Sequence, residues 1–256
     1  MIDPQARISP RAQLADNVSV GAFAVIGDDV SIDAGCRIGP HAVVHGPTRM
    51  GRDNQVFQFA SIGDAPQDRK YRGEPTRLEI GDRNVFRECC TVNRGTVGGH
   101  GVTRIGDDCL FMANTHVAHD CVVGNQVIMA NLATLGGHVE LGEHVIMGGL
   151  SAVHQFCKIG AHAFIANNAA VTRDVPPYVM AVGQPAEPHS VNSEGLKRRG
   201  FSAVQIRNIK QAYRLLYRSD LPLEQARRQI TELADTQPEL GIFAGFIAAS
   251  TRSLVR

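Results

Sequence analysis

Apolar residues recur every six positions along the first two thirds of the chain. The series covers residues 2–62, resumes over 80–92 after a break at 64–77, and restarts one residue out of phase over 105–171 after a second break at 97–103. A period of six fits neither an α-helix, with about 3.6 residues per turn, nor a strand with alternating side chains. It is typical of a hexapeptide-repeat parallel β-helix, in which each hexad makes a short strand and a bend. We therefore predict a mainly β fold.

The positions after the apolar residue are of two kinds. The second is often glycine, as at Gly21, Gly39 and Gly51, and we expect these glycines to relieve the backbone where the chain turns. The fifth is small or branched and is expected to pack beside the inward-facing residue. It contains five of the six cysteines: Cys36, Cys90, Cys109, Cys121 and Cys157. These thiols are predicted to fill the core in a reducing compartment, and disulfides or thiolate metal ligands are not expected.

The period becomes helical near the end of the chain, after a proline-containing connector at 176–186. Ser202 and Gln205 form a capping box, which predicts a helix start. Helices are expected over 192–200, 203–218, 223–234 and 238–250. The predicted domains are therefore a β-helix at 1–186 and a small helical domain at 187–256 that packs on it.

Composition limits the class of protein. The chain has 256 residues, of which 43% are apolar and 20% charged, as is ordinary for a globular protein in water. Its apolar runs fall short of the roughly 20 residues of a membrane span, and its start lacks the features of a signal peptide. A cytoplasmic protein without membrane insertion is predicted, and no feature suggests a nucleic-acid partner.

Charge is unevenly distributed although the net charge is only +1. Residues 190–256 contain 11 Lys and Arg against 6 Asp and Glu, whereas residues 1–189 contain 15 against 19. The basic C-terminal part favours an acidic partner surface. A solvated helix face without a partner is the alternative.

Stacking the hexads three to a coil brings distant polar residues together. Residues 18 apart then occupy adjacent coils, separated by about 4.8 Å. One corner of the coil becomes a strip of catalytic side-chain types, which comprises His119, Gly137, Gln155, Asp120, His138 and His154. The strip predicts an active site, and the alternative is a scatter of surface histidines in a chain that has 10 of them.

The chemistry of the strip favours acyl transfer. His119 beside Asp120 can hold one tautomer and take a proton from a hydroxyl, and Gly137 can offer its N–H to an oxyanion. Because Cys121 fills an inward position, we expect direct attack by a substrate hydroxyl and no acyl-enzyme. Two other features suit substrate binding: Gln67, Asp68 and Lys70 in the first break, and the pair Arg198 and Arg199, which suits phosphate.

Two other functions stay open at this point. His116, His119 and His138 could bind Zn²⁺, as in the β-helical carbonic anhydrases, which are lyases. A non-catalytic scaffold is the second alternative.

Several motifs are more specific than the repeat. They are Gln58–Gly63 (QFASIG), Lys70–Arg77 (KYRGEPTR), Ala118–Cys121 (AHDC), Gly137–Val139 (GHV), Val153–Cys157 (VHQFC), Asp174–Tyr178 (DVPPY) and Asn192–Phe201 (NSEGLKRRGF). With them, the chain resembles, nearly from end to end, the UDP-N-acetylglucosamine O-acyltransferases that begin lipid A biosynthesis.

The resemblance implies a left-handed β-helix and a homotrimer with active sites between neighbouring subunits. It implies transfer of an (R)-3-hydroxyacyl chain from acyl carrier protein to the 3-hydroxyl of UDP-N-acetylglucosamine, without metal or cofactor. His119 matches the general base, Asp120 the residue that orients it, and Gly137 the oxyanion-hole backbone. The family's substrate-contacting positions are matched by Gln67, Asp68, Lys70, His116, His138, His154 and Gln155. Its nucleotide-binding positions are matched by Asn192, Glu194, Arg198 and Arg199.

Two positions depart from the family pattern. Asn93 stands where the family often has His, which suggests a 3-amino sugar nucleotide as an alternative acceptor. Asn167 stands where some long-chain members have Gly at the end of the acyl groove. Because the larger side chain removes room, we expect a preference for chains shorter than about 14 carbons.

Overall fold

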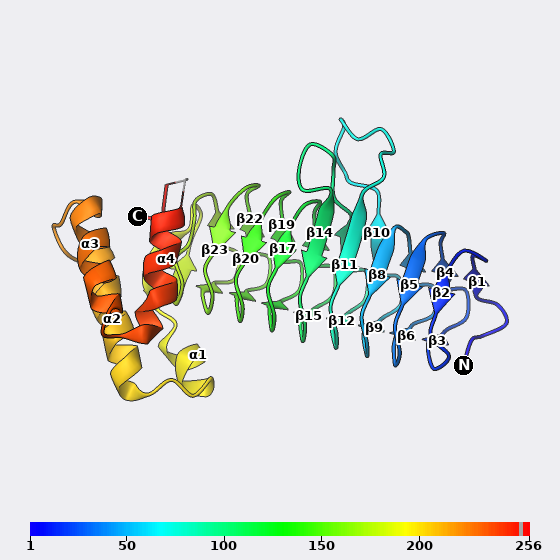
Figure 1. Ribbon diagram of the computed structural model, residues 1–256, viewed down its shortest axis with the longest axis horizontal. Helices are drawn as coiled ribbons and strands as arrows, with labels where there is room; N and C mark the ends of the chain where they lie inside the picture. The colour runs from blue at the N-terminus through cyan, green and yellow to red at the C-terminus, as the bar shows by residue number, and fades with distance from the viewer. Residues whose placement is uncertain (251–252) are drawn as a thin grey trace.

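The computed structural model describes residues 1–250 and 253–256. Figure 1 shows an elongated body of stacked coils that runs from the N-terminus to a group of helices at the opposite end. The coils form the expected left-handed parallel β-helix. In the part of the chain described, no helix combines the length and the apolar character needed to cross a membrane.

Three sheets run along the sides of the coil. The first contains β1 (Arg7–Ile8), β4 (Val25–Ile26), β7 (Val43–Val44), β10 (Ser61–Asp64), β13 (Thr91–Asn93), β16 (His116–Val117), β19 (Thr134–Leu135), β22 (Ala152–Val153) and β25 (Ala170–Val171). The second contains β2 (Gln13–Leu14), β5 (Val30–Ile32), β8 (Thr48–Met50), β11 (Arg77–Ile80), β14 (Val102–Ile105), β17 (Val122–Val123), β20 (Glu140–Leu141) and β23 (Lys158–Ile159). The third contains β3 (Ser19–Val20), β6 (Arg37–Ile38), β9 (Gln55–Val56), β12 (Val85–Phe86), β15 (Leu110–Phe111), β18 (Ile128–Met129), β21 (Ile146–Met147), β24 (Phe164–Ile165), β26 (Val179–Val182) and β27 (Glu187–Val191).

The strand register confirms a coil of 18 residues in the second half of the β-helix. Val117 of β16 pairs with Leu135 of β19, which pairs with Val153 of β22. Two earlier coils are longer, because Ile62 pairs with Val92 and Val92 with Val117. Their extra residues leave the body as two loops, β10–β11 and β13–β14, which project from the same side in Figure 1. Both loops lie at the breaks in the period of six.

The core lies inside the coil and is built from the first and fifth residues of the hexads. The cysteines at the fifth position, Cys36, Cys90, Cys109, Cys121 and Cys157, are all buried and form no disulfide in the described residues, whereas Cys89 is exposed. Their predicted role as core residues is therefore confirmed.

The expected role of the second-position glycines is wrong at Gly21, Gly39 and Gly51, although Gly63 does have a positive φ of 80°. Gly21 and Gly39 lack a positive φ, and the left-handed conformation occurs instead at the fourth position, as at Phe23 (φ 59°) and His41 (φ 58°). A Cβ added to Gly39 would lie 2.9 Å from the carbonyl oxygen of Val56 in the next coil. Glycine is needed there because neighbouring coils approach closely, since a contact under 3 Å would force the backbone apart.

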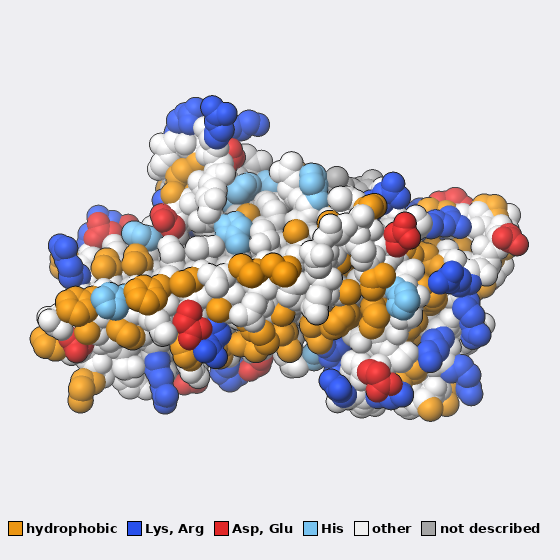
Figure 2. All heavy atoms as spheres, turned by 180° about the vertical axis from the view of Figure 1, so that it is seen from behind, with side chains coloured by type: hydrophobic (Ala, Val, Ile, Leu, Met, Phe, Trp, Pro, Cys, Tyr) orange, Lys and Arg blue, Asp and Glu red, His pale blue; other side chains and the backbone are white. Residues whose placement is uncertain are grey.

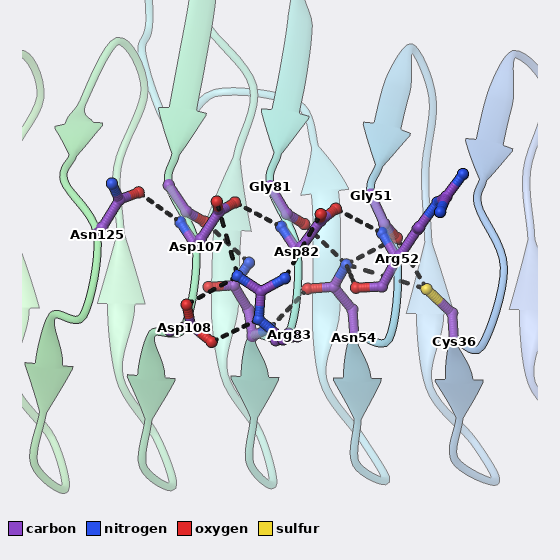
Figure 3. A network of polar contacts seen from close by, with 12 residues as sticks. Cys36, Gly51, Arg52, Asn54, Gly81, Asp82, Arg83, Asp107, Asp108 and Asn125 are labelled. Carbon is purple, nitrogen blue, oxygen red and sulfur yellow. Dashed lines mark hydrogen bonds and ion pairs between the residues drawn. The ribbon is translucent and has the colours of Figure 1, made fainter.

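Buried asparagines take the fifth position in two consecutive coils. The Asn54 side chain donates to the carbonyl oxygens of Gly51 and Gly81, both at 2.8 Å, and accepts the Asn84 N–H at 2.9 Å. Figure 3 shows Asn54 between neighbouring coils in this network. Asn84 in turn accepts the Cys109 N–H at 2.8 Å. Because buried amides are stable only with such partners, these bonds fix the coils against each other.

The C-terminal helices match the predicted ones closely. They are α1 (Ser193–Arg198), α2 (Ala203–Tyr217), α3 (Leu223–Ala234), a short 3₁₀ turn η1 (Pro238–Leu240) and α4 (Gly241–Ala249). The predicted capping box is present, since the Ser202 side chain accepts the Gln205 N–H and the Gln205 side chain accepts the Ser202 N–H. The Tyr178 hydroxyl donates to the Glu239 carbonyl oxygen at 2.7 Å, which fastens the helices to the last coil.

The segment expected as a connector is more ordered than predicted. Met180 of β26 pairs with Phe164 of β24, so the third sheet continues beyond the last regular hexad. β27 then returns antiparallel to β26 and ends at Val191, past the expected end of the β-helix at residue 186. The alternation of buried Val179 and Ala181 with less buried neighbours is that of a strand with one face on the core.

Candidate active site

His119 and Asp120 lie in the bend between β16 and β17, where the first and second sheets meet. They are the third and fourth residues of the hexad that begins at Val117. Asp120 has a φ of 59°, the left-handed conformation of the fourth position, which Asp adopts more readily than most residues. Its side chain is fully buried, whereas that of His119 keeps 16% of its surface exposed. The pair thus joins a buried acid to an accessible imidazole.

Hydrogen bonds from three residues reach the Asp120 carboxylate. His119 Nδ1 lies 2.9 Å from Oδ2, and the Thr96 hydroxyl donates to the same oxygen at 2.6 Å. The backbone N–H of Thr96 donates to Oδ2 at 3.0 Å, and that of His100 to Oδ1 at 2.9 Å. Both oxygens are therefore surrounded by donors, as a buried carboxylate requires.

These bonds keep the Asp120 carboxylate ionised and place a proton on Nδ1 of His119. Burial acts to raise the pKa of Asp120, but hydrogen bonds from His119 and Thr96 outweigh it and lower that pKa to about 2. At neutral pH the carboxylate is ionised and can only accept, so His119 must carry a proton on Nδ1. In the neutral imidazole with this tautomer, Nε2 has the free lone pair that a general base needs.

Gly137 lies against the His119 ring from the next coil, as the 18-residue spacing predicts. A Cβ added to Gly137 would lie 2.6 Å from His119 Cε1 and 2.8 Å from Nε2, so the ring can keep this position only beside glycine. Among residues 1–250 and 253–256, the Gly137 N–H has no hydrogen-bond acceptor. It is free to bind a developing oxyanion near Nε2.

His138 completes the cluster. Its ring stacks on Phe156 with centroids 4.3 Å apart and meets the His119 ring edge to face at 5.1 Å. Its Nε2 lies 3.8 Å from Asp120 Oδ2. Burial lowers the pKa of His138, and the negative charge of Asp120 opposes that lowering only in part. A neutral imidazole here can exchange hydrogen bonds with a sugar hydroxyl.

The other predicted residues of the strip surround this cluster. His116 lies on β16, its Nδ1 is 2.7 Å from the Thr91 hydroxyl, and burial followed by the nearby charge of His119 lowers its pKa. His154 and Gln155 are exposed in the coil beyond Gly137. The structure therefore places these residues along one corner, with His119, Asp120 and His138 in direct contact.

The β10–β11 loop carries Gln67, Asp68 and Lys70. Asp68 lies close enough to His138 for its charge to oppose the lowering of that histidine's pKa, whereas Gln67 and Lys70 are exposed. The Asn93 side chain is buried at the foot of the loop and donates to the Ala65 carbonyl oxygen at 3.0 Å. Asn93 thus helps to hold the loop over the corner.

The residues predicted for the nucleotide lie at a different corner, where the second and third sheets meet. Asn192 caps α1 by accepting the Gly195 N–H, and it donates to the His162 carbonyl oxygen at 3.0 Å. Arg199 donates to the His144 carbonyl oxygen at 2.8 Å, and burial lowers its pKa. Glu194 and Arg198 are exposed on the same helix.

Asn167 lies at the third corner, where the 18-residue spacing stacks it on Gly149 and Asn131 of the preceding coils. Its Oδ1 accepts the Gly149 N–H at 2.9 Å, and its side chain is otherwise exposed. Asn168 donates its N–H to the Gly149 carbonyl oxygen, which confirms the stacking of this corner. The amide therefore folds back over the glycine and occupies space that a glycine at 167 would leave open.

The residues present do not fit the zinc site considered from the sequence. In the described residues, the atoms close enough to share an ion belong to His119, Asp120 and His138, and not to His116. The oxygens of Asp120 already accept from backbone N–H groups and a hydroxyl, so a cation would displace bonds that the buried carboxylate needs. The donor set favours a hydrogen-bonded acid–imidazole pair.

Sequence reasoning missed several residues that contact this pair. Thr96 and His100 lie in the β13–β14 loop, which interrupts the repeat, so the 18-residue spacing could not place them. Thr103 accepts the Asp120 N–H at 2.8 Å from the same region. The one available signal was the glycine-rich run around His100, which marks a tight turn but not its neighbour.

Comparisons with known proteins identify the family of the chain. Residues 174–255 match the family model for domain 2 of UDP N-acetylglucosamine O-acyltransferase, and residues 11–46 and 102–137 match bacterial transferase hexapeptide repeats. A relative from Herminiimonas arsenicoxydans, named acyl-[acyl-carrier-protein]–UDP-N-acetylglucosamine O-acyltransferase, is 53% identical over 100% of this chain and 99% of its own length. The chain belongs to the UDP-N-acetylglucosamine O-acyltransferase family.

Solved members of the UDP-N-acetylglucosamine O-acyltransferase family share the whole fold. The Moraxella catarrhalis RH4 enzyme is 42% identical, with a TM-score of 0.97 over 100% of this chain and 99% of its own. The UDP-N-acetylglucosamine acyltransferase of Francisella novicida is 38% identical, with a TM-score of 0.98 over 100% of this chain and 94% of its own. The β-helix, the loops and the C-terminal helices therefore belong to one family architecture, and the resemblance drawn from the motifs is confirmed.

Proposed function

We propose that this protein transfers an (R)-3-hydroxyacyl chain from acyl carrier protein to the 3-hydroxyl of UDP-N-acetylglucosamine, the first step of lipid A biosynthesis. Family membership over the full chain supports the reaction class. The observation that carries the mechanism is the His119–Asp120 pair, set against a glycine whose N–H is free. The same acyl transfer needs no cofactor.

In the proposed mechanism, His119 Nε2 takes the proton of the 3-hydroxyl as its oxygen attacks the thioester carbonyl carbon. The Gly137 N–H donates to the oxyanion that forms. Collapse of the tetrahedral intermediate breaks the carbon–sulfur bond, and the imidazolium returns the proton to the leaving thiolate. Asp120 stays ionised and stabilises the imidazolium throughout.

The C-terminal helices provide a surface for the acidic donor protein. A hollow on α1 and α2 is lined by Lys197, Phe201, Ala203, Ile206, Arg207, Lys210 and Arg214. Figure 2 shows Lys and Arg side chains gathered over this end of the molecule, with few acidic ones among them. Positive charge around apolar side chains suits an acidic partner that also presents an apolar contact. The free cysteines support a reducing, cytoplasmic location.

The assembly that we propose is a homotrimer with shared sites. His119 lies where the first and second sheets meet, whereas Arg199 and Asn192 contact residues where the second and third sheets meet. One subunit thus presents the catalytic pair and the nucleotide-binding residues on different edges. A neighbouring copy can bring the two edges together around one substrate.

The proposal is tested by assaying acyl carrier protein donors with UDP-N-acetylglucosamine. We expect ester formation that a chelator does not inhibit, and a fall of about 10²- to 10⁴-fold in kcat for His119→Ala with the trimer intact by size-exclusion chromatography. His41→Ala, in the N-terminal coils, is the matched control and should keep wild-type turnover. Near wild-type turnover by His119→Ala would reject His119 as the base.

The same assay decides the acceptor. Asn93 Oδ1 is buried and has no hydrogen-bond partner in the described residues, which favours testing a 3-amino sugar nucleotide beside UDP-N-acetylglucosamine. Amide formation at a higher kcat/KM than ester formation would replace the proposed acceptor. Carbon dioxide hydration, dependent on added zinc, would instead support the lyase alternative, and inactivity in every assay would support a scaffold.

A further inference from the structure

The β13–β14 loop packs on the Asp120 carboxylate and donates hydrogen bonds to both of its oxygens. Thr96 contributes two donors to it, its hydroxyl at 2.6 Å and its N–H at 3.0 Å from Oδ2, and His100 adds its N–H to Oδ1. Thr96 itself is only 6% exposed, so water does not compete for these bonds. Thr96 and Asp120 are 24 residues apart in the sequence. This spacing is not a multiple of the 18-residue coil, so the repeat does not predict the contact.

The loop is held rigidly in this place. The N–H groups of Gly99 and Gly101 both donate to the Thr96 carbonyl oxygen, at 3.1 and 2.9 Å, which closes a tight turn. The Arg77 N–H donates to the Gly101 carbonyl oxygen at 3.0 Å and ties the turn to β11. A Cβ added to Gly99 would lie 2.5 Å from Asp120 Cγ, so the turn packs directly on the carboxylate.

We propose that Thr96 is a positioning residue that acts through Asp120 on His119; this rests on the acyl transfer proposed above. The carboxylate only accepts, so the Thr96 hydroxyl must donate its proton to Oδ2. The Thr96 hydroxyl and N–H donate to Oδ2 and the His100 N–H donates to Oδ1, which leaves Oδ2 oriented to accept the Nδ1–H of His119. Thr96 therefore fixes both the rotation of the carboxylate and the tautomer of the imidazole.

A merely structural role for Thr96 makes a different prediction. If the hydroxyl only stabilised the turn, its loss would lower stability and affect substrate binding and turnover together. If it positions the catalytic pair, its loss lowers kcat while KM for UDP-N-acetylglucosamine changes little. The effect must also disappear when Asp120 can no longer orient His119, because the two residues then act as one unit.

The experiment measures kcat, KM and melting temperature for Thr96→Val, Thr96→Ser and a control. Loss of a hydrogen bond to a buried charge predicts a fall of about 10- to 100-fold in kcat for Thr96→Val, with KM within about twofold. Thr96→Ser, which keeps the hydroxyl, should recover most of the activity. Thr76→Val is the control, because the Thr76 hydroxyl is buried and has no partner in the described residues; its kcat should match the wild type.

A double-mutant cycle with Asp120→Asn completes the test. In that background, Thr96→Val should change kcat by less than about twofold, since there is no carboxylate left to position. Wild-type kcat in Thr96→Val, or a full additional loss in the Asp120→Asn background, would overturn the proposal. If Thr96→Val does not fold, Thr96→Ala removes the same hydroxyl without adding an atom and must show the same loss.

The outcome also separates this inference from the proposed reaction. A wild-type protein that does not acylate UDP-N-acetylglucosamine would contradict the reaction itself. An active wild type with an equally active Thr96→Val would contradict only the role of Thr96.

Discussion

Gly137→Ala is the sharpest test of the site geometry, because alanine keeps the backbone N–H and adds a single carbon. Gly137 does not have a positive φ, so alanine is compatible with its backbone. The new Cβ would lie 2.6 Å from His119 Cε1 and 2.8 Å from Nε2. Contacts that short cannot persist, so the ring must turn away, and its Nδ1 bond to Asp120, 2.9 Å long, must break.

The expected loss follows from what the displaced ring contributes. General base catalysis is worth about 10²- to 10⁴-fold, so kcat should fall about 100-fold or more. The His119 side chain is partly exposed and can rotate toward solvent, so the free energy of unfolding should change by less than about 1 kcal/mol. Activity and stability are therefore expected to separate in this variant.

The assay is ester formation from acyl carrier protein donors, with denaturant unfolding on the same samples. Gly27→Ala is the matched control, because its added Cβ would meet nothing nearer than the Val44 carbonyl oxygen at 3.4 Å, an ordinary contact. It should leave both measurements unchanged. Wild-type kcat in Gly137→Ala would show that the free N–H of residue 137 is all that the reaction needs there, and the steric reasoning would be wrong.

Three further predictions follow from other parts of the chain. Asn167→Gly should shift the preferred donor toward longer acyl chains, because the amide now occupies that space beside Gly149; an unchanged ranking in a donor series would contradict this. Burial, with the nearby charges of His144 and Arg199, lowers the pKa of His162 to about 4. As the pH drops from about 6.5 to 4, the unfolded chain therefore binds a proton at this histidine before the folded protein does, and the free energy of unfolding should fall over that range. His162→Phe should flatten that part of a stability–pH curve, and an equally steep curve would exclude His162 as the cause. Asn54→Ala leaves the Gly81 carbonyl oxygen and the Asn84 N–H without a partner, and the Gly51 carbonyl oxygen with only the Cys36 thiol. It should cost about 2 kcal/mol in urea unfolding, whereas a loss below about 0.5 kcal/mol would show that relaxation or water satisfies these groups.

The regular part of the structure could be predicted because each six-residue repeat corresponds to one side of the coil. The period of six locates the strands, and the spacing of 18 alone predicts that Gly137 lies beside His119. The repeat pattern did not show why glycine is needed at the second position. Their sequence pattern is the same for a turn and for a close approach, and only the φ angles and the neighbouring coil distinguish the two.

The parts that were not predictable lie outside the repeat. Prolines and glycine lie beside β26, at Pro176, Pro177, Gly183 and Pro185, so local composition indicated a connector. Pairing with β24 nevertheless makes β26 a strand, and β27 pairs with it in turn. Thr96 and His100 belong to a loop whose position depends on its contacts and not on a period. Long-range hydrogen bonds of this kind leave no trace in spacing.

The regular coil and the loop that interrupts it contribute differently to the catalytic acid–imidazole pair. A β-helix repeats the same backbone at each corner, and its fourth position can bury a carboxylate such as Asp120 beside an accessible His119. The repeat alone provides few donors for that carboxylate, and a buried anion without donors would take up a proton and lose its hold on the imidazole. The β13–β14 loop inserts three donors at this corner, from Thr96 and His100. The coil therefore sets the spacing of the catalytic groups, and the interruption of the coil keeps the acid charged.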